Sequence, residues 1–186
     1  MNPVSPSSDL VRRAQTGDHH AFSELVRGCD EAMRRLAHRL LGSRSAMDDA
    51  LQDAYLKAYR KLDDFDGRSS FSTWMYTIVY RTCLDHLRTR GRRAEIDLGS
   101  VPEPAGDVDP AERHADLDAL GRALRDLPPD QAAAILLVDG DGCSYEEASV
   151  VLGVREGTIA SRLNRARSAL RSALRPDAPR EGVHDE

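Results

Sequence analysis

Residues 143–171 read CSYEEASVVLGVREGTIASRLNRARSALR, and this stretch decides the fold of the second half of the chain. Ser144 followed by Glu147 has the form of a capping box, which predicts the start of a short helix that ends near Gly153. A turn of a few residues then leads into a longer helix from about Gly157. Two helices joined by a short glycine-bearing turn predict a helix-turn-helix.

The longer helix has two chemically different sides. With an advance of about 100° per residue, one side gathers the apolar residues Ile159, Leu163, Ala166, Leu170, Ala173 and Leu174. The opposite side carries Ser161, Asn164, Arg165 and Ser168, with Thr158, Ala160 and Arg171 at its margins. Hydroxyl, amide and guanidinium groups of this kind contact base edges and phosphates in a major groove. The alternative is the ordinary solvated face of an amphipathic helix.

Charge is unevenly distributed along the chain, whose net charge is −5. Residues 68–93 hold six Arg and one acidic residue, and residues 155–175 hold six Arg and one acidic residue. Residues 91–120 hold eight acidic residues and three Arg. Because local fields decide whether a polyanion binds, two basic patches beside an acidic joint are compatible with a nucleic-acid partner despite the negative total.

Cysteine usage and hydropathy limit the cellular context. Cys29, Cys83 and Cys143 are far apart and form no CxxC pair, so neither a disulfide framework nor a zinc site is expected. The first fifteen residues contain no apolar segment of signal-peptide length, and no run approaches the roughly 18 apolar residues of a membrane span. We therefore expect a soluble, cytoplasmic protein with reduced thiols and no membrane insertion.

Helical periodicity dominates the rest of the chain. Helices are predicted to follow caps at Ser8 or Asp9, at Asp18 and at Ser45, and to include an apolar series from Met33 to Gly42. A further helix is expected from about Phe71 to Arg88, and helical pattern resumes at Leu117 and again after Pro128 and Pro129. The fold class predicted is all-α: two small helical domains joined by a flexible acidic linker, the second a four-helix domain with the helix-turn-helix. The boundaries predicted are residues 1–92, a linker at 93–112, residues 113–175, and a disordered tail at 176–186.

The helix-turn-helix stretch also resembles a known family. In residues 143–171, SYEE, GT and SRL-RAR occur at the spacings found in the promoter-reading region of bacterial RNA polymerase sigma factors of the extracytoplasmic function (ECF) class, and LPPDQAAAILLVDGDG resembles the family's entry helix. The resemblance implies contacts with the minus-thirty-five element by Thr158, Ser161, Arg162, Asn164, Arg165 and Ser168. Ala160 and Val138 depart from the family, whose members often have a basic residue there, so phosphate anchoring at these two positions is not expected.

The first half resembles the same family's most characteristic block. It reads DDALQDAYLKAYRKLDDFDGRSSFSTWMYTIVYRTCLDHLRTRGRR at residues 48–93. The resemblance spans about residues 9–93 and 115–175, and it implies that Asp49, Gln52 and Asp53 contact the clamp of core RNA polymerase. On their own, these groups form an acid and amide cluster suited to arginines of a partner. Two alternatives are plain surface charge and a magnesium site at Asp48, Asp49 and Asp53.

Residues that follow this helix are expected to handle the minus-ten element. The turn FDGRSS, residues 65–70, corresponds to the family's loop that captures a flipped base. The alternative is that these residues only form a turn and line no pocket. On the next helix a polar wedge contains Thr73, Thr77, Arg81 and Arg88, with Trp74 at its edge and Arg92 and Arg93 beyond it. The minus-ten contacts predicted are Gly67, Arg68, Ser69, Ser70, Trp74, Thr77, Arg81 and Arg88.

Together these patterns predict a transcription initiation factor without enzymatic activity. Its expected partners are the clamp helices and flap of core RNA polymerase, promoter DNA and an anti-sigma factor, and no catalytic residue, metal or cofactor is expected. One alternative is a free-standing helix-turn-helix repressor or activator, which would bind DNA without polymerase as a dimer. Another is an enzyme using His19, His20 and carboxylates, but adjacent histidines point to different helix faces.

Overall fold

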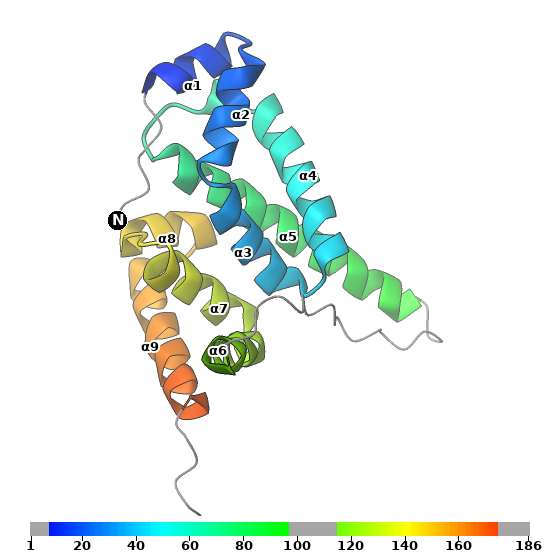
Figure 1. The fold of residues 1–186 in the computed structure, drawn as a ribbon, viewed down its shortest axis with the longest axis vertical. Helices are drawn as coiled ribbons and strands as arrows, with labels where there is room; N and C mark the ends of the chain where they lie inside the picture. Colours follow the sequence, from blue (N-terminus) through cyan, green and yellow to red (C-terminus); the bar gives the residue numbers. More distant parts are fainter. Residues whose placement is uncertain (1–7, 97–114, 175–186) are drawn as a thin grey trace, which may run out of the picture.

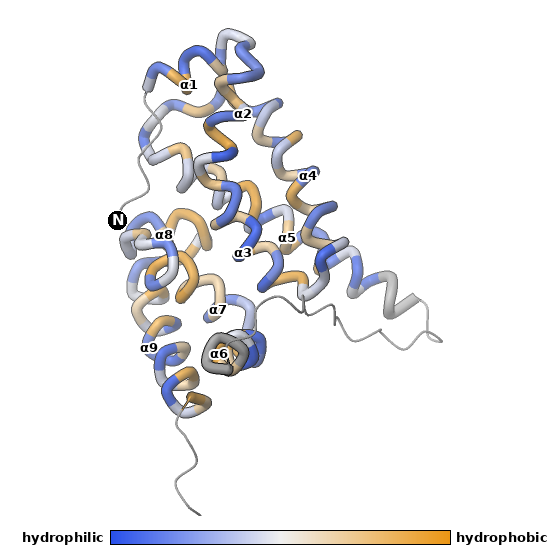
Figure 2. The backbone as a smooth tube through the Cα atoms, viewed as in Figure 1, coloured by the Kyte–Doolittle hydropathy of each residue, from blue (hydrophilic) through white to orange (hydrophobic). Residues whose placement is uncertain are grey.

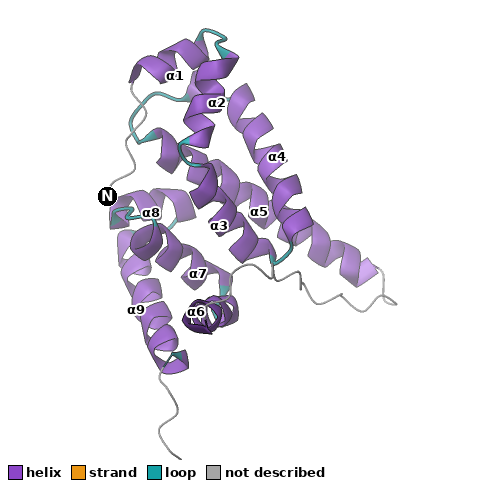
Figure 3. Ribbon diagram, in the orientation of Figure 1, coloured by secondary structure: helices purple, strands orange, loops and turns teal. Residues whose placement is uncertain are grey.

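The computed structural model describes residues 8–96 and 115–174, and this part of the chain contains helices and no strands (Figures 1 and 3). The predicted all-α class is therefore confirmed. The first helical group comprises α1 (Ser8–Gln15), α2 (His19–Arg27), α3 (Asp30–Leu41), α4 (Arg44–Arg60), the 3-10 turn η1 (Leu62–Asp64) and α5 (Phe71–Ile96). The second helical group comprises α6 (Ala115–Asp126), α7 (Pro129–Ile135), the π-helical turn η2 (Leu136–Gly140), α8 (Tyr145–Leu152) and α9 (Glu156–Ala173).

Side chains cap the starts of two helices in the first group, α2 and α4. Asp18 caps α2, because its carboxylate accepts the backbone N–H groups of His20 and Ala21 at 3.0 Å each, as predicted. The predicted cap at Ser45 is wrong. Ser43 caps α4 instead, with extended backbone and its hydroxyl 3.4 Å from the N–H of Ala46, so the helix already includes Ser45 in its first turn. A serine two residues earlier offered the same chemistry.

Helix α5 lies at the centre of the first group and is longer than predicted. It packs against α3 and α4 and buries residues on two sides: Phe71, Met75, Val79, Tyr76, Tyr80 and Cys83. Helix α5 is thus held between neighbouring helices. It continues beyond Arg88 to Ile96, so residues 93–96, predicted as linker, are helical. Residues 97–112 of the predicted linker and the predicted tail at 176–186 lie outside the described residues.

The second group is built around the predicted helix-turn-helix. Ser144 and Glu147 form the capping box of α8, each accepting the other's backbone N–H, and Gly153 ends α8 in a left-handed conformation with φ +65°. The chain before α8 is irregular. It leaves α7 through η2, where the N–H of Asp141 donates to Leu136 O at 2.9 Å, and turns at Gly142 with φ +72°.

The two groups lie against each other, with α3 contacting α7 and α5 contacting α8. Each helix carries both hydrophilic and hydrophobic stretches (Figure 2), and the buried apolar residues of both groups form one continuous cluster. Burial raises the pKa of the thiols of Cys29, Cys83 and Cys143 to about 12, and all three are free. Among the described helices none combines the length and apolar content needed to cross a bilayer.

Candidate nucleic-acid interface

Helix α9 presents one buried and one exposed side. Ile159, Leu163 and Ala166 are fully buried against the second group, while four of the predicted contact residues are exposed: Ser161, Asn164, Arg165 and Ser168. Thr158 is half-buried at the margin of this face, and Ser161 donates its hydroxyl to Thr158 O at 2.9 Å. Within the described residues, no group forms a hydrogen bond or ion pair with the side chains of Asn164 and Arg165. These side chains are available to an external partner.

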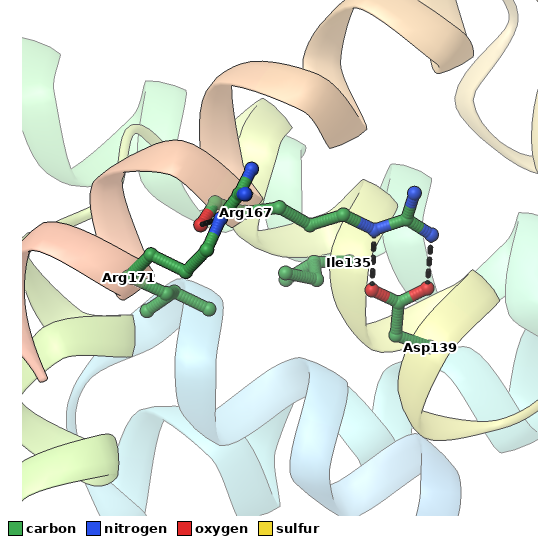
Figure 4. Close-up of a pocket in the computed structure, with 5 residues that line it drawn as sticks. Ile135, Asp139, Arg167 and Arg171 are labelled. Carbon is green, nitrogen blue, oxygen red and sulfur yellow. Dashed lines mark hydrogen bonds and ion pairs between the residues drawn. The ribbon is translucent and has the colours of Figure 1, made fainter.

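Two other α9 arginines are engaged inside the protein. Arg162, a predicted DNA contact, pairs with Asp130 of α7 at 3.0 Å and its side chain is only 18% exposed. Arg167 forms a bidentate pair with Asp139, with distances of 2.9 and 2.6 Å (Figure 4). The hydrogen bond and then the charge of Asp139 raise the pKa of the Arg167 guanidinium above its ordinary value. The structure therefore places Arg165 outward and ties Arg162 and Arg167 to the second helical group.

The loop before α5 borders a hollow of about 500 Å³. Three of the four residues predicted for a base pocket line it, namely Gly67, Ser69 and Ser70. Arg68 does not line it; its guanidinium pairs with Asp66 at 2.8 Å and its side chain is 90% exposed. Gly67 has φ +75°, which favours glycine and allows the sharp turn. Ser70 fixes the end of the loop by accepting the N–H of Thr73 at 3.0 Å.

Helix α1 supplies a side of this hollow that was not predicted. Ser8, Val11 and Gln15 line it, and the amide of Gln15 donates to the carbonyls of Leu62 and Phe65 at 3.1 and 3.0 Å. These bonds attach α1 to the loop that carries the predicted contacts. Gln15 could not be found from its own neighbourhood, because both carbonyls lie about fifty residues later in the chain.

Aromatic side chains pack together at both ends of the loop 65–70. Phe65, Phe71 and Trp74 form a cluster with ring centroids 5.3 to 5.8 Å apart. Phe65 and Phe71 are buried, whereas Trp74 is half-buried at the edge of the cluster. Tilted and edge-on contacts of this kind stabilise the mutual orientation of the rings. The loop is thus held on a packed base, which suits a preformed pocket.

The predicted polar wedge of α5 is divided by the fold. Arg81 and Arg88 are exposed, and Arg88 pairs with Asp85 at 3.3 Å. Thr77 is half-buried and donates to Thr73 O at 3.1 Å. Thr73 is only 2% exposed, and its hydroxyl donates to Glu147 of α8 at 3.1 Å. The arginine end of the wedge therefore faces solvent, while its N-terminal end faces the second helical group.

Helix α4 carries the third predicted surface. Asp49, Gln52 and Asp53 are exposed while Met47, Ala50, Leu51 and Ala54 are buried, as the apolar pattern predicted. Leu56, 49% exposed, extends the same face at the spacing i, i+3, i+4, i+7 from Asp49, and sequence reasoning missed it. A helical wheel continued for one more turn would have included it. Leu56 therefore adds an exposed apolar side chain to the acid and amide groups of this face.

The carboxylates of α4 do not converge. Asp48 accepts from Arg34 of α3 at 3.0 Å, whereas Asp53 lies 2.9 Å from Nε2 of His86 of α5. Tyr55 points inward and donates to Asp30 at 2.6 Å; burial, and then the hydrogen bond with Asp30, raise the pKa of its phenol. No group of three or more metal-ligating side chains occurs among the residues that the structure describes.

Comparison with known proteins identifies two family regions in the chain. Residues 25–93 match the family Sigma-70 region 2, and residues 117–170 match the family Sigma-70, region 4. The RNA polymerase sigma-H factor of Pseudomonas aeruginosa is 36% identical, over 90% of this chain and 93% of that protein. The ECF RNA polymerase sigma-E factor of Escherichia coli K12 is 35% identical over the same shares of the two chains.

Solved structures agree with the sequence relatives. The sigma factor RpoE of Bartonella quintana, in complex with the anti-sigma factor NepR, superposes with a TM-score of 0.75 at 32% identity, over 84% of this chain and 98% of that chain. CnrH, in complex with the cytosolic domain of CnrY, superposes with a TM-score of 0.69 at 26% identity, over 93% and 99% of the two chains.

Proposed function

The chain belongs to the sigma-70 family of RNA polymerase sigma factors, in its ECF class, and on this basis we propose a division of labour among its three exposed polar surfaces. As a sigma factor it binds core RNA polymerase and directs it to specific promoters. It has no enzymatic role of its own, since the polymerase performs the chemistry. What needs assignment is which residues of this chain make each contact.

The exposed face of α9 that carries Ser161, Asn164, Arg165 and Ser168, called the reading face below, contacts the minus-thirty-five element. The observation that carries this assignment is the separation on one helix of fully buried Ile159 and Leu163 from exposed Asn164 and Arg165. A guanidinium and an amide that have no side-chain partner among the described residues can donate to base edges in a major groove, and Ser161, Ser168 and Thr158 can contact phosphates or bases beside them. Arg162 contributes to the same surface only if it leaves Asp130.

The loop 65–70 and α5 contact the minus-ten element. The hollow beside Gly67, Ser69 and Ser70 accepts an extruded base, whose unstacking costs a few kcal/mol and needs a preformed site to offset it. Trp74, at the edge of the aromatic cluster, stacks on a DNA base. Arg68 lies outside the hollow, and its charge contacts the phosphate backbone of the DNA. Thr77, Arg81 and Arg88 then follow the single strand along α5.

The exposed face of α4 binds the polymerase clamp. Asp49, Gln52 and Asp53 offer acceptors for arginines of a partner helix, and Leu56 adds an apolar contact at the same face. The clamp contact and the minus-ten contacts lie within residues 1–92. Residues 93–112 link the two regions, and the contacts with the minus-thirty-five element and the polymerase flap lie within residues 113–175. The factor acts in the cytoplasm, where RNA polymerase works, and an anti-sigma factor regulates it, as in the solved RpoE–NepR complex.

Reconstitution tests the assignment directly. The full chain is combined with core polymerase on a promoter library from the source genome, and transcripts are sequenced. We expect initiation at a discrete promoter set that requires both the chain and the polymerase. Promoter binding by the free chain as a dimer on palindromic sites, without polymerase-dependent initiation, would instead indicate a repressor and overturn the proposal.

A further inference from the structure

The loop before α5 is held at its two ends by different parts of the chain. Its C-terminal end is fixed locally, because Ser70 Oγ accepts the backbone N–H of Thr73 at 3.0 Å in the first turn of α5. Its N-terminal end is held from a distance. The amide nitrogen of Gln15, on α1, donates to the carbonyls of Leu62 and Phe65 at 3.1 and 3.0 Å, across 47 and 50 residues of chain. Helix α1 therefore helps to determine where the loop begins.

The turn inside this loop is closed by its own side chains. The carboxylate of Asp66 accepts the backbone N–H of Arg68 at 3.1 Å and pairs with the Arg68 guanidinium at 2.8 Å. Both bonds lie within the loop, so they fix the shape of the turn and not its position against α1. Phe65 O, directly before the turn, accepts from Gln15. The position of the turn against α1 therefore depends on Gln15.

The hollow of about 500 Å³ lies between two walls that Gln15 joins. One wall belongs to α1 and includes Ser8, Val11 and Gln15, and the other belongs to the loop beside it and includes Asp66 and Gly67 (Figure 1). A binding site discriminates between similar ligands only if its groups are held to within about 0.5 Å. Because Gln15 lines one wall and bonds to the other, it fixes the separation of the two.

Helix α1 does not need Gln15 to stay in place. Ala14 is buried, and the Arg13 guanidinium pairs with Asp18, the cap of α2, at 2.7 Å. These contacts hold α1 on α2, whereas both hydrogen bonds of the Gln15 amide nitrogen go to the other wall of the hollow. Loss of the Gln15 amide should therefore loosen the loop and leave α1 packed on α2.

We propose that Gln15 is a positioning residue of the minus-ten base pocket: by holding the loop before α5 at a fixed distance from α1, it sets how strictly the pocket discriminates among bases. The proposal rests on the proposed function, which places an extruded base in this hollow. A loosened wall still admits a base but rejects an incorrect one less strongly, because specificity is a difference between two binding free energies. Loss of the Gln15 amide should therefore lower base discrimination at one promoter position, while binding to core polymerase is retained.

Trp74 provides a native reporter of loop position that requires neither DNA nor polymerase. It is the one tryptophan of the chain, and it is half-buried. Its ring centroid lies 5.3 Å from that of Phe65, the residue whose carbonyl accepts from Gln15. A loop that moves away from α1 carries the Phe65 ring with it and uncovers the indole. Acrylamide should then quench the fluorescence of Trp74 more strongly.

The test compares the full-length chain with Gln15→Ala and Gln15→Glu, which remove both amide donors, and with Gln15→Lys, which restores a donor to the carbonyls. Arg12→Ala is the control on α1, since its guanidinium is exposed and pairs with Asp9 of the same helix at 2.7 Å. Ser43→Ala is the control for stability, because it removes the cap of α4 in the same helical group without touching the hollow.

Two measurements are made on each variant. The chain is assembled with core polymerase on a promoter from the reconstitution experiment, in a library whose minus-ten bases are randomised and linked to a transcribed barcode. Sequencing of the transcripts gives the base preference at each minus-ten position. Acrylamide quenching of Trp74 is measured on the free chain, thermal unfolding by circular dichroism gives the Tm, and competition with a reference sigma factor measures binding to core polymerase.

We expect Gln15→Ala and Gln15→Glu to lower base discrimination at one minus-ten position at least about fivefold, the effect of one lost hydrogen bond, and to increase quenching of Trp74. Gln15→Lys should recover part of both properties. Arg12→Ala and Ser43→Ala should match wild type in both, even where Ser43→Ala lowers the Tm as much as Gln15→Ala does.

Discrimination or quenching that is unchanged in Gln15→Ala would overturn the positioning role, and so would discrimination that falls evenly at every position or falls equally in Ser43→Ala. Wild type separates this failure from that of the proposed function. A wild-type chain that initiates with a base preference that Gln15→Ala shares loses only the positioning role, whereas a wild-type chain that does not initiate, or shows no preference at minus ten, loses both.

Discussion

Arg165 and Arg167 lie two residues apart on α9, yet their surroundings differ. The Arg167 guanidinium is fixed by both oxygens of Asp139, whereas Arg165 is exposed on the reading face. Because a bidentate ion pair must be broken before its arginine can contact DNA, the two residues have unequal access to a promoter. Residue type and position on the helix are therefore insufficient to identify a DNA contact; the internal partner decides.

Arg165→Ala should weaken binding of the polymerase–sigma complex to the minus-thirty-five element. A bidentate contact to a base is worth about 1–3 kcal/mol, which corresponds to roughly five- to 150-fold in affinity. Arg122→Ala, an exposed arginine on α6, is the control for loss of one positive charge. Filter binding on wild-type and mutated minus-thirty-five sequences gives the measurement. Equal losses for the two variants would argue against a base contact.

Asp30 should make stability depend on pH in the acid range. Burial alone raises the pKa of its carboxyl, but hydrogen bonds from Tyr55 and Arg34 outweigh burial and lower the pKa below its ordinary value. The stabilisation is then present above the unfolded pKa of about 3.9 and is lost as pH falls through the folded pKa. Thermal unfolding should show Asp30→Asn less stable than wild type at pH 7, with a difference that shrinks below about pH 4. A difference independent of pH would contradict this account.

The turn between α8 and α9 requires glycine at position 153 for its backbone conformation and not for lack of space around a Cβ. Gly153 has φ +65°, and a Cβ added there would meet no atom within 4 Å. Gly153→Ala should cost about 1 kcal/mol from left-handed strain alone and lower the Tm by a few degrees. Gly157→Ala is the matched change inside α9, where a Cβ is equally unobstructed and alanine is the better helix former. Calorimetry should therefore show opposite signs for these two substitutions.

Helix α4 is predicted to act as a docking element through one face. Leu56→Asp should leave the fold intact, because the side chain is already 49% exposed, but it should weaken binding to core polymerase about tenfold or more by placing a charge in an apolar contact. Leu174→Asp, another exposed leucine, controls for loss of an apolar group. Competition with a reference sigma factor for core polymerase measures the effect. Equal binding by the two variants would remove Leu56 from the interface.

Promoter melting is predicted to need the molecule as a whole, because the proposed function assigns one promoter element to each helical group. Arg81→Ala with Arg88→Ala should impair open-complex formation more than polymerase binding, and should reduce the slope of log K against log salt by about 1 for each phosphate that the protein no longer neutralises. Permanganate footprinting measures melting, and competition measures polymerase binding. Unchanged melting would remove these arginines from the strand path.

Much of the architecture was predictable from local pattern. Apolar periodicity identified the helical segments and the buried side of α4, and capping chemistry identified the starts of α2 and α8. The predicted start of α4 was misplaced because Ser43 and Ser45 both carry a hydroxyl that can cap a helix N-terminus, and only the backbone conformation distinguishes them. The end of α5 was also misplaced, since α5 continues past the last clear apolar repeat.

At the scale of the whole molecule, sequence alone determined the helical class, the order of the two family regions and the segregation of basic from acidic segments. These properties depend on neighbours within a few residues, or on composition, which a linear pattern records. Tertiary structure alone decided which polar groups are free: Thr73 and Arg162 are engaged, and Asp141 is buried between helices. The physical reason is that a helical wheel gives a side chain's direction about its own axis, whereas the covering partner comes from another helix. For Asp141 and Arg35 that partner is 106 residues away.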